Sequence, residues 1–334
     1  MAKSILIIGA GGFIGSYLVE EALRRGYETW AAVRATTSRR YLTDERIRFL
    51  ELDFNDEEAM REAFSRHGAW DYVVHNLGAT KCLNYSDFDR INYGYLRAVV
   101  EALRAAEAMP QAFVMMSSLS AMGLGDEKGY TPFTTAMTPA PNTRYGLSKM
   151  KAEQWLRAQA DVPAIILRPT GVYGPRERDY FLMFKSIKAG FDFTVGFRRQ
   201  LLTFIYVADL ATAALQAIEA SATTIGRTYI IAHPTAYTQA QFRAIAMREL
   251  GKRVVLPVKC PLWILYAVSV IAEAIGRLRG KPSTLNRDKY IIMKQRNWTA
   301  DVEPARRDFN FNPRFDLPEG VKEAIKWYRE NKWF

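Results

Sequence analysis

Three segments of this 334-residue chain place a tyrosine four positions before a lysine, a spacing that suits proton transfer. They read YGLSK at 145–149, YIIMK at 290–294 and YRENK at 328–332. In a helix, residues four apart share a face, so a lysine ammonium can stabilise a phenolate and lower the tyrosine pKa. Such a tyrosine could exchange a proton with an alcohol or ketone oxygen, which a phenol of pKa about 10 does poorly at neutral pH. Spacing alone does not choose among the three.

A glycine motif near the start of the chain predicts a phosphate-binding loop. Gly9, Gly12 and Gly15 follow the apolar run SILII and open an amphipathic segment. The first glycine permits a tight turn, the second lets backbone approach a pyrophosphate, and the third lets helix and strand pack closely. The helix start, with Phe13 and Ile14, would then present its backbone N–H groups to the phosphates.

The elements that must position these residues alternate along the chain. Strand-like runs occur at 28–34, 47–53, 71–77, 112–118 and 164–170, and helical patterns separate most of them. This alternation predicts an α/β Rossmann fold, with a doubly wound parallel sheet that binds ligands at the carboxyl ends of its strands. Gly9, Arg34, Asp53, Leu77 and Ser118 all fall at or near such ends.

The alternation breaks after about residue 174, which indicates a second, smaller unit. The segments FIYVADLATAALQAIEA and GRTYIIA still resemble a strand, a helix and a strand of the first unit. We therefore expect an NADP-binding Rossmann domain of residues 1–175 plus about 204–232. A smaller C-terminal substrate domain would hold about 176–203 plus 233–334, with the substrate between the two.

The end of the second expected strand bears on the cofactor. NAD sites usually carry an acidic residue there, but this chain reads AAVRATTSRR, with Arg34 in that place and Arg39 and Arg40 behind it. A guanidinium suits a 2′-phosphate, so NADP is expected in preference to NAD; solvated surface arginines are the alternative for Arg39 and Arg40. Asp53, beside Phe54, is a candidate to bond the adenine amino group, with a helix N-cap region as its alternative.

Composition excludes several other classes. The formal charge of +11 could attract nucleic acid, a membrane surface or a phosphorylated ligand. The sequence has no zinc-finger spacing, basic zipper or aromatic RNA-binding signature, so no nucleic-acid partner is expected. Two distant cysteines fit a reducing compartment, taken as the cytoplasm, and three scattered histidines offer no metal-ligand spacing.

The longest apolar stretch, from Cys260 to Gly276, is short for a membrane span and contains Glu273. It predicts a buried or amphipathic helix. Flanking Lys259, Arg277 and Arg279 leave a peripheral membrane contact as the less favoured alternative.

Taken together, the motifs resemble the extended short-chain dehydrogenase/reductases of the NAD-dependent epimerase/dehydratase family. The marks are the glycine triplet and the segments LDFND, HNLGAT, INYGYLRAVVEA, SSLSAMG, YGLSK, LRPTGVYGP and TFIYVADLA, which cover most of the chain. The C-terminal half is most similar to the 3β-hydroxysteroid dehydrogenase and dihydroflavonol reductase branch.

The resemblance implies a catalytic triad of Ser118, Tyr145 and Lys149. Ser117 and Ser120 are rivals for the serine on spacing alone. The other two tyrosine–lysine pairs lack a strand-end serine or glycine context and are interpreted as structural. Ser118 would hydrogen-bond the substrate oxygen as charge develops, and Lys149 would also hold the nicotinamide ribose.

The same resemblance implies further cofactor contacts. The nicotinamide side would be lined by Leu77, Gly78 and Ala79, with Asn92 supporting a water or backbone bond nearby. Residues near the nicotinamide amide would be Pro169, Thr170 and Val172. A homodimer through the helices beginning near Asp87 and Tyr145 is also implied.

Two positions at which this chain departs from the sugar-nucleotide members of the family bear on its substrate. Sugar-nucleotide members of the family usually carry an asparagine at Thr170 and an arginine at Leu202. We therefore expect an NADP-dependent oxidoreductase that interconverts a ketone and a secondary alcohol on a fairly apolar small molecule, steroid-like or flavonoid-like. The alternatives are a sugar-nucleotide or polyprenyl-sugar epimerase/dehydratase and a non-catalytic NADP-binding regulator.

Overall fold

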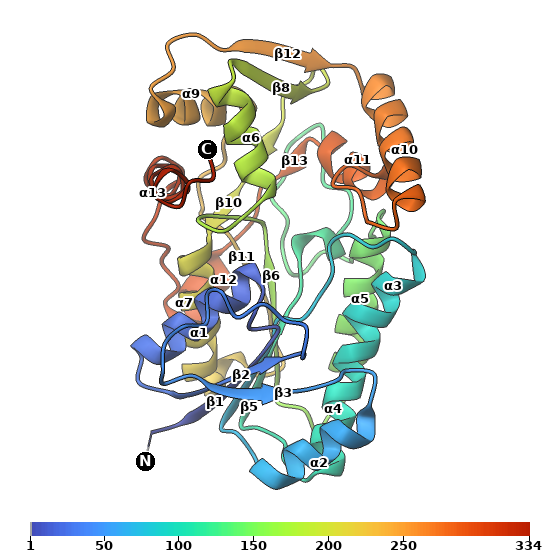
Figure 1. Ribbon diagram of the computed structural model, residues 1–334, viewed down its shortest axis with the longest axis vertical. Helices are drawn as coiled ribbons and strands as arrows, with labels where there is room; N and C mark the ends of the chain where they lie inside the picture. The colour runs from blue at the N-terminus through green and yellow to red at the C-terminus, as the bar shows by residue number, and fades with distance from the viewer. Residues whose placement is uncertain (1) are drawn as a thin grey trace.

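A seven-stranded parallel sheet forms the centre of the molecule in the computed structural model, which describes residues 2–334 (Figure 1). The strand order is β11-β6-β5-β4-β1-β2-β3, and every neighbouring pair is parallel. The strands are β1 (Ser4–Ile8), β2 (Glu28–Val33), β3 (Arg48–Glu51), β4 (Tyr72–His75), β5 (Ala112–Met116), β6 (Ala164–Pro169) and β11 (Thr228–Ile231). Each strand-like run expected from the sequence contains one of them, and the predicted Rossmann-type fold is confirmed.

Helices cover both faces of the sheet, as burial of a parallel sheet requires. The alternation within β1 shows this directly: Ile5 and Ile7 pack into one apolar cluster, while Leu6 and Ile8 pack into another. The first cluster includes residues of α1 (Phe13–Arg24) and α7 (Val207–Glu219). The second includes residues of α2 (Glu57–His67), α4 (Tyr95–Ala105) and α5 (Arg144–Arg157).

The order in which successive strands join the sheet changes side at β1. From there β2 and β3 extend the sheet on one side, and β4, β5, β6 and β11 extend it on the other. Such a switch point opens a crevice at the carboxyl ends of the strands, where dinucleotides bind in folds of this type. The expected site residues therefore belong at this end of the sheet.

A second group of elements lies beyond those carboxyl ends (Figure 1). It comprises α6 (Asp179–Lys188), β8 (Phe191–Val195), α9 (Gln239–Leu250), β12 (Leu256–Cys260), α10 (Leu262–Leu278), α11 (Arg287–Lys294) and α13 (Leu317–Glu330). Phe184, Phe242, Ile325 and Tyr328 belong to its apolar cluster. Short elements complete the chain: α3 (Ser86–Asp89), the π-helix η1 (Arg90–Gly94), the 3₁₀ helix η2 (Leu119–Ala121), β9 (Leu201–Leu202), α8 (Ser221–Thr224) and β13 (Asn297–Trp298).

Two segments differ from the sequence-based expectation. The strand β10 (Phe204–Tyr206) does not join the main sheet; it pairs with β7 (Gly171–Tyr173) in a separate two-stranded sheet. In addition, α12 (Glu303–Phe309) contacts β11 and α8, although its position in the chain assigned it to the substrate domain. Its Phe309 and Ala305 enter the first apolar cluster, so a late segment completes the core beneath the sheet. The full division into two domains stays a prediction.

Candidate active site

The glycine loop has the geometry that the sequence predicted. Gly9 has a φ of +85°, which favours glycine, and its carbonyl accepts a hydrogen bond from the Gly12 amide over 3.1 Å. A Cβ on Gly15 would lie 2.1 Å from the Gly9 oxygen, so only glycine lets α1 approach the loop this closely. Gly12 is exposed at the helix start, where amides are available to an anion.

Ser118 and Tyr145 meet at the carboxyl end of β5. Ser118 lies two residues past the end of β5 and caps η2, its Oγ accepting the Ser120 amide over 3.2 Å. The Ser118 hydroxyl lies near the side chain of Tyr145, which is in the first turn of α5. Burial raises the pKa of Tyr145, and the nearby Ser118 hydroxyl offsets only part of the rise. The sequence predicted a lowered pKa; here burial, which disfavours the phenolate, is the larger effect.

Lys149 lies one turn further along α5 and is almost fully buried. Its Nζ donates to the carbonyl of Met116, the last residue of β5, over 2.9 Å. Burial lowers the pKa of Lys149 to about 8, while nearby Glu153 acts in the opposite direction. A Cβ on Gly78 would come within 2.9 Å of this Nζ, so the loop after β4 lies directly over the ammonium group.

The start of α5 is held from two directions. Thr143 caps the helix by accepting the Gly146 amide over 3.0 Å. Asp288, from α11, accepts the amide of Tyr145 itself over 3.0 Å. The sequence analysis missed Asp288, because no local pattern relates it to a residue so distant in the chain.

Asn92 binds the predicted loop rather than facing open space. It is buried in the π-helical turn η1, where its Oδ1 accepts the Ala79 amide over 2.8 Å and its Nδ2 donates to the Ala79 carbonyl over 3.0 Å. The same Nδ2 donates to Ser148 Oγ over 2.9 Å. This agrees with the backbone-bond role expected for Asn92, and it ties the nicotinamide-side loop to α5. Leu77 is partly buried against the second apolar cluster.

The rival serines have other partners. Ser117 is buried and donates to Glu153 Oε1 over 2.5 Å. Glu153 in turn pairs with buried Arg168, the two side chains forming two hydrogen bonds of 2.9 and 2.5 Å. Ser120 is also buried. Of the three serines, Ser118 is the one whose hydroxyl acts on the pKa of Tyr145.

The two other tyrosine–lysine pairs occupy structural positions. Tyr328 is fully buried and donates to the carbonyls of Gly174 and Glu177, while Lys332 lies beyond the end of α13. Lys294 lies over the ring of Tyr290 in α11. Neither pair shares the strand end that carries Ser118.

Of the residues expected around adenosine, some are exposed and others already contact other parts of the protein. Arg34 and Asp53 are exposed. The pKa of Asp53 is lowered mainly because its carboxylate accepts the Asn55 amide, and the positive charge of Arg34 lowers it further. Arg39 lies over the ring of Phe49 and 3.6 Å from Glu51, so it already has partners on β3. The side chain of Phe54 is buried in the second apolar cluster, which leaves only its backbone to meet a ligand. The N-cap of α2 is Asp56, not Asp53.

The segment after β6 contains a polar atom that a ligand could satisfy. Pro169 ends β6, and Val172 in β7 packs partly against the first apolar cluster. Between them, Thr170 Oγ1 is buried and has no hydrogen-bond partner within residues 2–334. Together with the glycine loop, this buried hydroxyl fits a site for a nicotinamide dinucleotide.

A cluster missed by the sequence analysis joins three elements near the site. Asp179 in α6 lies 2.6 Å from Lys81 Nζ and 3.2 Å from Lys289 Nζ. Burial would raise the pKa of Asp179, but the two lysines outweigh it and lower the pKa. The loop after β4, α6 and α11 are thereby linked through one carboxylate.

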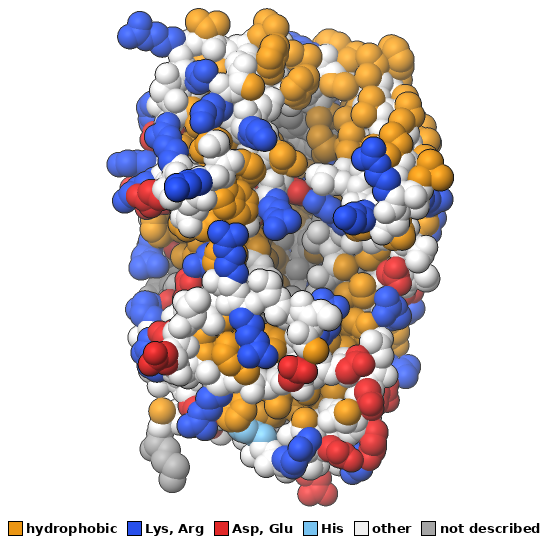
Figure 2. All heavy atoms as spheres, in the orientation of Figure 1, with side chains coloured by type: hydrophobic (Ala, Val, Ile, Leu, Met, Phe, Trp, Pro, Cys, Tyr) orange, Lys and Arg blue, Asp and Glu red, His pale blue; other side chains and the backbone are white. Residues whose placement is uncertain are grey.

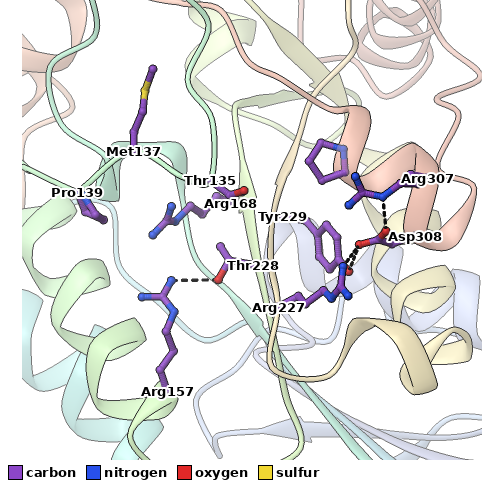
Figure 3. Close-up of a pocket in the computed structure, with 11 residues that line it drawn as sticks. Thr135, Met137, Pro139, Arg157, Arg168, Arg227, Thr228, Tyr229, Arg307 and Asp308 are labelled. Atoms are coloured by element: carbon purple, nitrogen blue, oxygen red, sulfur yellow. Dashed lines mark hydrogen bonds and ion pairs between the residues drawn. The ribbon is translucent and has the colours of Figure 1, made fainter.

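A separate pocket of about 370 Å³ lies outside this site, beside β6 and β11 (Figure 3). Its lining includes Arg157, Arg168, Arg227 and Arg307. Each guanidinium already pairs with a carboxylate, the first two with Glu153 and the others with Asp308. Since no member of the expected triad lines it, this pocket is not the active site.

The sequence matches the NAD dependent epimerase/dehydratase family over residues 5–232. The chain belongs to this family. It is therefore an enzyme of the short-chain dehydrogenase/reductase type, as the motifs indicated, and the non-catalytic regulator loses its support. Among residues 2–334 no group of three or more potential ligand side chains could hold a metal ion.

Several family relatives align over nearly their whole length. A ceramide reductase of Caulobacter vibrioides is 24% identical, with 98% of this chain and 95% of the relative covered. A UDP-glucose 4-epimerase of Vibrio cholerae is 24% identical with the same coverage. A decarboxylating sterol-4-alpha-carboxylate 3-dehydrogenase of Saccharomyces cerevisiae is 22% identical, with 98% of each chain covered.

A solved structure supports the fold. The dTDP-glucose 4,6-dehydratase of Bacillus anthracis, in complex with NAD, has a TM-score of 0.78 and 18% identity, covering 100% of this chain and 98% of its own. The family's description names NAD dependence, and the choice between NAD and NADP is a separate question.

Proposed function

We propose that this family member is an NADP-dependent oxidoreductase that interconverts a ketone and a secondary alcohol on an apolar, lipid-like substrate. The observation that carries the reaction type is the placement of Ser118 beside Tyr145 at the carboxyl end of β5, with Lys149 one helical turn away. NADPH, when bound, would supply the hydride to the carbonyl carbon. Ser118 would then hold the developing oxyanion and the Tyr145 phenol would protonate it, which completes the alcohol.

The substrate class rests on three lines of support. Two relatives are named for lipids, a ceramide and a sterol carboxylate. In addition, α6 and α10 stand on opposite sides of the hollow in the molecular surface (Figures 1 and 2) and carry exposed apolar side chains, among them Leu182, Met183 and Tyr266. Leu202 also takes the place of the arginine that sugar-nucleotide members use, and its backbone pairs with Tyr237.

The preference for NADP rests on Arg34. Its exposed guanidinium follows β2, and no carboxylate lies within ion-pair distance of it among the described residues. It is thus available to a 2′-phosphate. Arg34→Asp should weaken NADPH binding relative to NADH, measured by nucleotide fluorescence; an unchanged preference would remove Arg34 from this role.

The reaction is tested by following NADPH consumption with long-chain ketones, 3-ketosteroids and UDP-glucose. We expect oxidation of NADPH in step with loss of a lipid ketone, and a fall of about 100-fold or more for Tyr145→Phe. Epimerisation of UDP-glucose without net cofactor turnover would instead establish the sugar-nucleotide alternative. The homodimer expected from the family resemblance stays a prediction, which analytical ultracentrifugation can test.

A further inference from the structure

One face of the molecule, distant from the glycine loop, has an unusual surface. It is built from residues 182–199 and 252–281, which include β8, β12 and α10, and we call it the docking face. In Figure 2 apolar side chains gather over β12 and α10 at the top and upper right. Contiguous apolar surface of this kind marks a protein or membrane contact.

The β8–β12 ribbon inverts the usual burial pattern. Along β8 the polar Asp192 and Thr194 are buried together with the terminal Val195, whereas Phe191 and Phe193 are exposed, the latter by 62%. Leu256 on β12 pairs with Phe191 and is exposed beside it. In a soluble two-stranded ribbon, polar residues normally face water. Here the outward side is the apolar one.

Helix α10 continues this surface. Of its residues only Leu265, Ser269 and Gly276 are buried, while Trp263 is 73% and Leu278 89% exposed. The helix has its main contact with α11, so most of its apolar circumference has no partner within residues 2–334. None of the helices described has the length and apolar character needed to cross a bilayer. A helix of this type suits a position parallel to an interface.

The docking face also accounts for most of the net positive charge of the protein. Its two segments contain ten lysines and arginines against two acidic residues, a net +8 of the chain's +11. Both acidic side chains already form ion pairs: Asp192 pairs with Arg243, and Glu273 pairs with Arg277 and Arg287. The remaining charge is free to attract an anionic surface.

We propose that the docking face binds an anionic lipid bilayer, with Trp263, Phe193 and neighbouring apolar side chains in the headgroup region. The apolar side chains suit the boundary between headgroups and acyl chains, and the basic side chains beside them suit the negative charge of the lipid headgroups. Face-to-face pairing of two copies would bring two net charges of +8 together, which opposes self-association. The inference goes beyond the proposed reaction and does not depend on it.

The test is co-sedimentation of the full chain, without cofactor or substrate, with phosphatidylcholine vesicles and with equimolar phosphatidylcholine–phosphatidylglycerol vesicles. We expect binding to the anionic vesicles that weakens with added salt. Trp263→Glu should lower the vesicle partition coefficient about tenfold or more, because a charge replaces an indole that would enter the headgroup region. Arg279→Glu should lower it about fivefold or more.

Matched controls lie at exposed positions elsewhere. Ile225→Glu and Arg66→Glu make the same kinds of change and should leave the partition coefficient unchanged. Circular dichroism checks that every variant remains folded. Equal partition of the protein and its Trp263→Glu variant would overturn the proposal. So would self-association that Trp263→Glu abolishes in the absence of vesicle binding, which would make the face an interface between copies.

Discussion

The backbone amide of Tyr145 donates a hydrogen bond of 3.0 Å to Asp288, 143 positions later in the chain. Burial raises the pKa of Asp288, and bonds from the Tyr145 and Arg144 amides oppose that rise. The carboxylate thus binds the positive end of α5 as a helix cap would. The position of the expected proton donor is therefore fixed in part from α11.

Replacing Asp288 tests this relationship. Asp288→Ala should cost about 1–3 kcal/mol in the free energy of unfolding, because it leaves buried amides without an acceptor. It should also lower kcat more than it raises the KM for cofactor. Asp288→Asn, which keeps one acceptor oxygen, should recover part of both losses. If denaturation midpoints of all three proteins coincide, the contact does not hold α5.

The pH dependence of stability should reveal Lys149. Burial lowers its pKa from 10.5 to about 8, so between these values the unfolded chain holds a proton that the folded chain has released. The free energy of unfolding should therefore rise with pH across this window, by about 3 kcal/mol in total. Denaturant titrations at several pH values should show the rise, and Lys149→Met should lack it. Lys151→Met, at an exposed position, should retain it.

The glycine loop allows a sharp comparison. Gly15→Ala places a Cβ 2.1 Å from the Gly9 oxygen, and relieving this clash should cost about 1–3 kcal/mol and weaken nucleotide binding. Gly94→Ala is the control, since Gly94 has helical angles and its nearest neighbour would be 3.7 Å away. That change should stabilise the protein by about 0.5–1 kcal/mol. Equal nucleotide affinity in both variants would contradict the assigned loop.

The buried pair of Glu153 and Arg168 should be far more sensitive than a surface pair. Glu153→Gln leaves the Arg168 charge uncompensated, and we expect a loss of about 3–5 kcal/mol. Glu219→Gln breaks the partly exposed pair with Arg25 and should cost about 0–1 kcal/mol. Urea denaturation of the two variants measures the difference. Similar midpoints would show that Arg168 finds another partner.

The sequence predicted the central sheet well because parallel strands are apolar runs separated by helices, and their ends converge at one edge. The role of Gly9 followed from the strand–turn–helix pattern, whereas Ser118 was preferred over Ser117 and Ser120 only through the family resemblance. The inward orientation of the Phe54 side chain was not predicted, since a residue just past a strand can turn inward, as this one does; its backbone contact with a cofactor stays a prediction. Likewise, the run at 204–206 has strand character that does not specify which sheet it joins.

Long-range contacts were beyond the sequence analysis. Asp288 reaches Tyr145 across the chain, and Asp179 pairs with Lys81 and Lys289 from different elements. Nothing in the local patterns around these residues distinguishes them from other surface charges. Asn92 was found only because it lies in a family-like motif, and its π-helical turn has no simple spacing signature.

The late contribution of α12 has a consequence for biosynthesis. This helix packs on β11 and places Phe309 beneath the sheet, although about 70 residues separate it from that strand. A chain emerging from the ribosome can form the earlier strands, but it cannot close this part of the core until residues 303–311 have been made. The nascent protein must therefore keep the apolar surface beside β11 uncovered until α12 has been synthesised, a period in which chaperone binding would protect it.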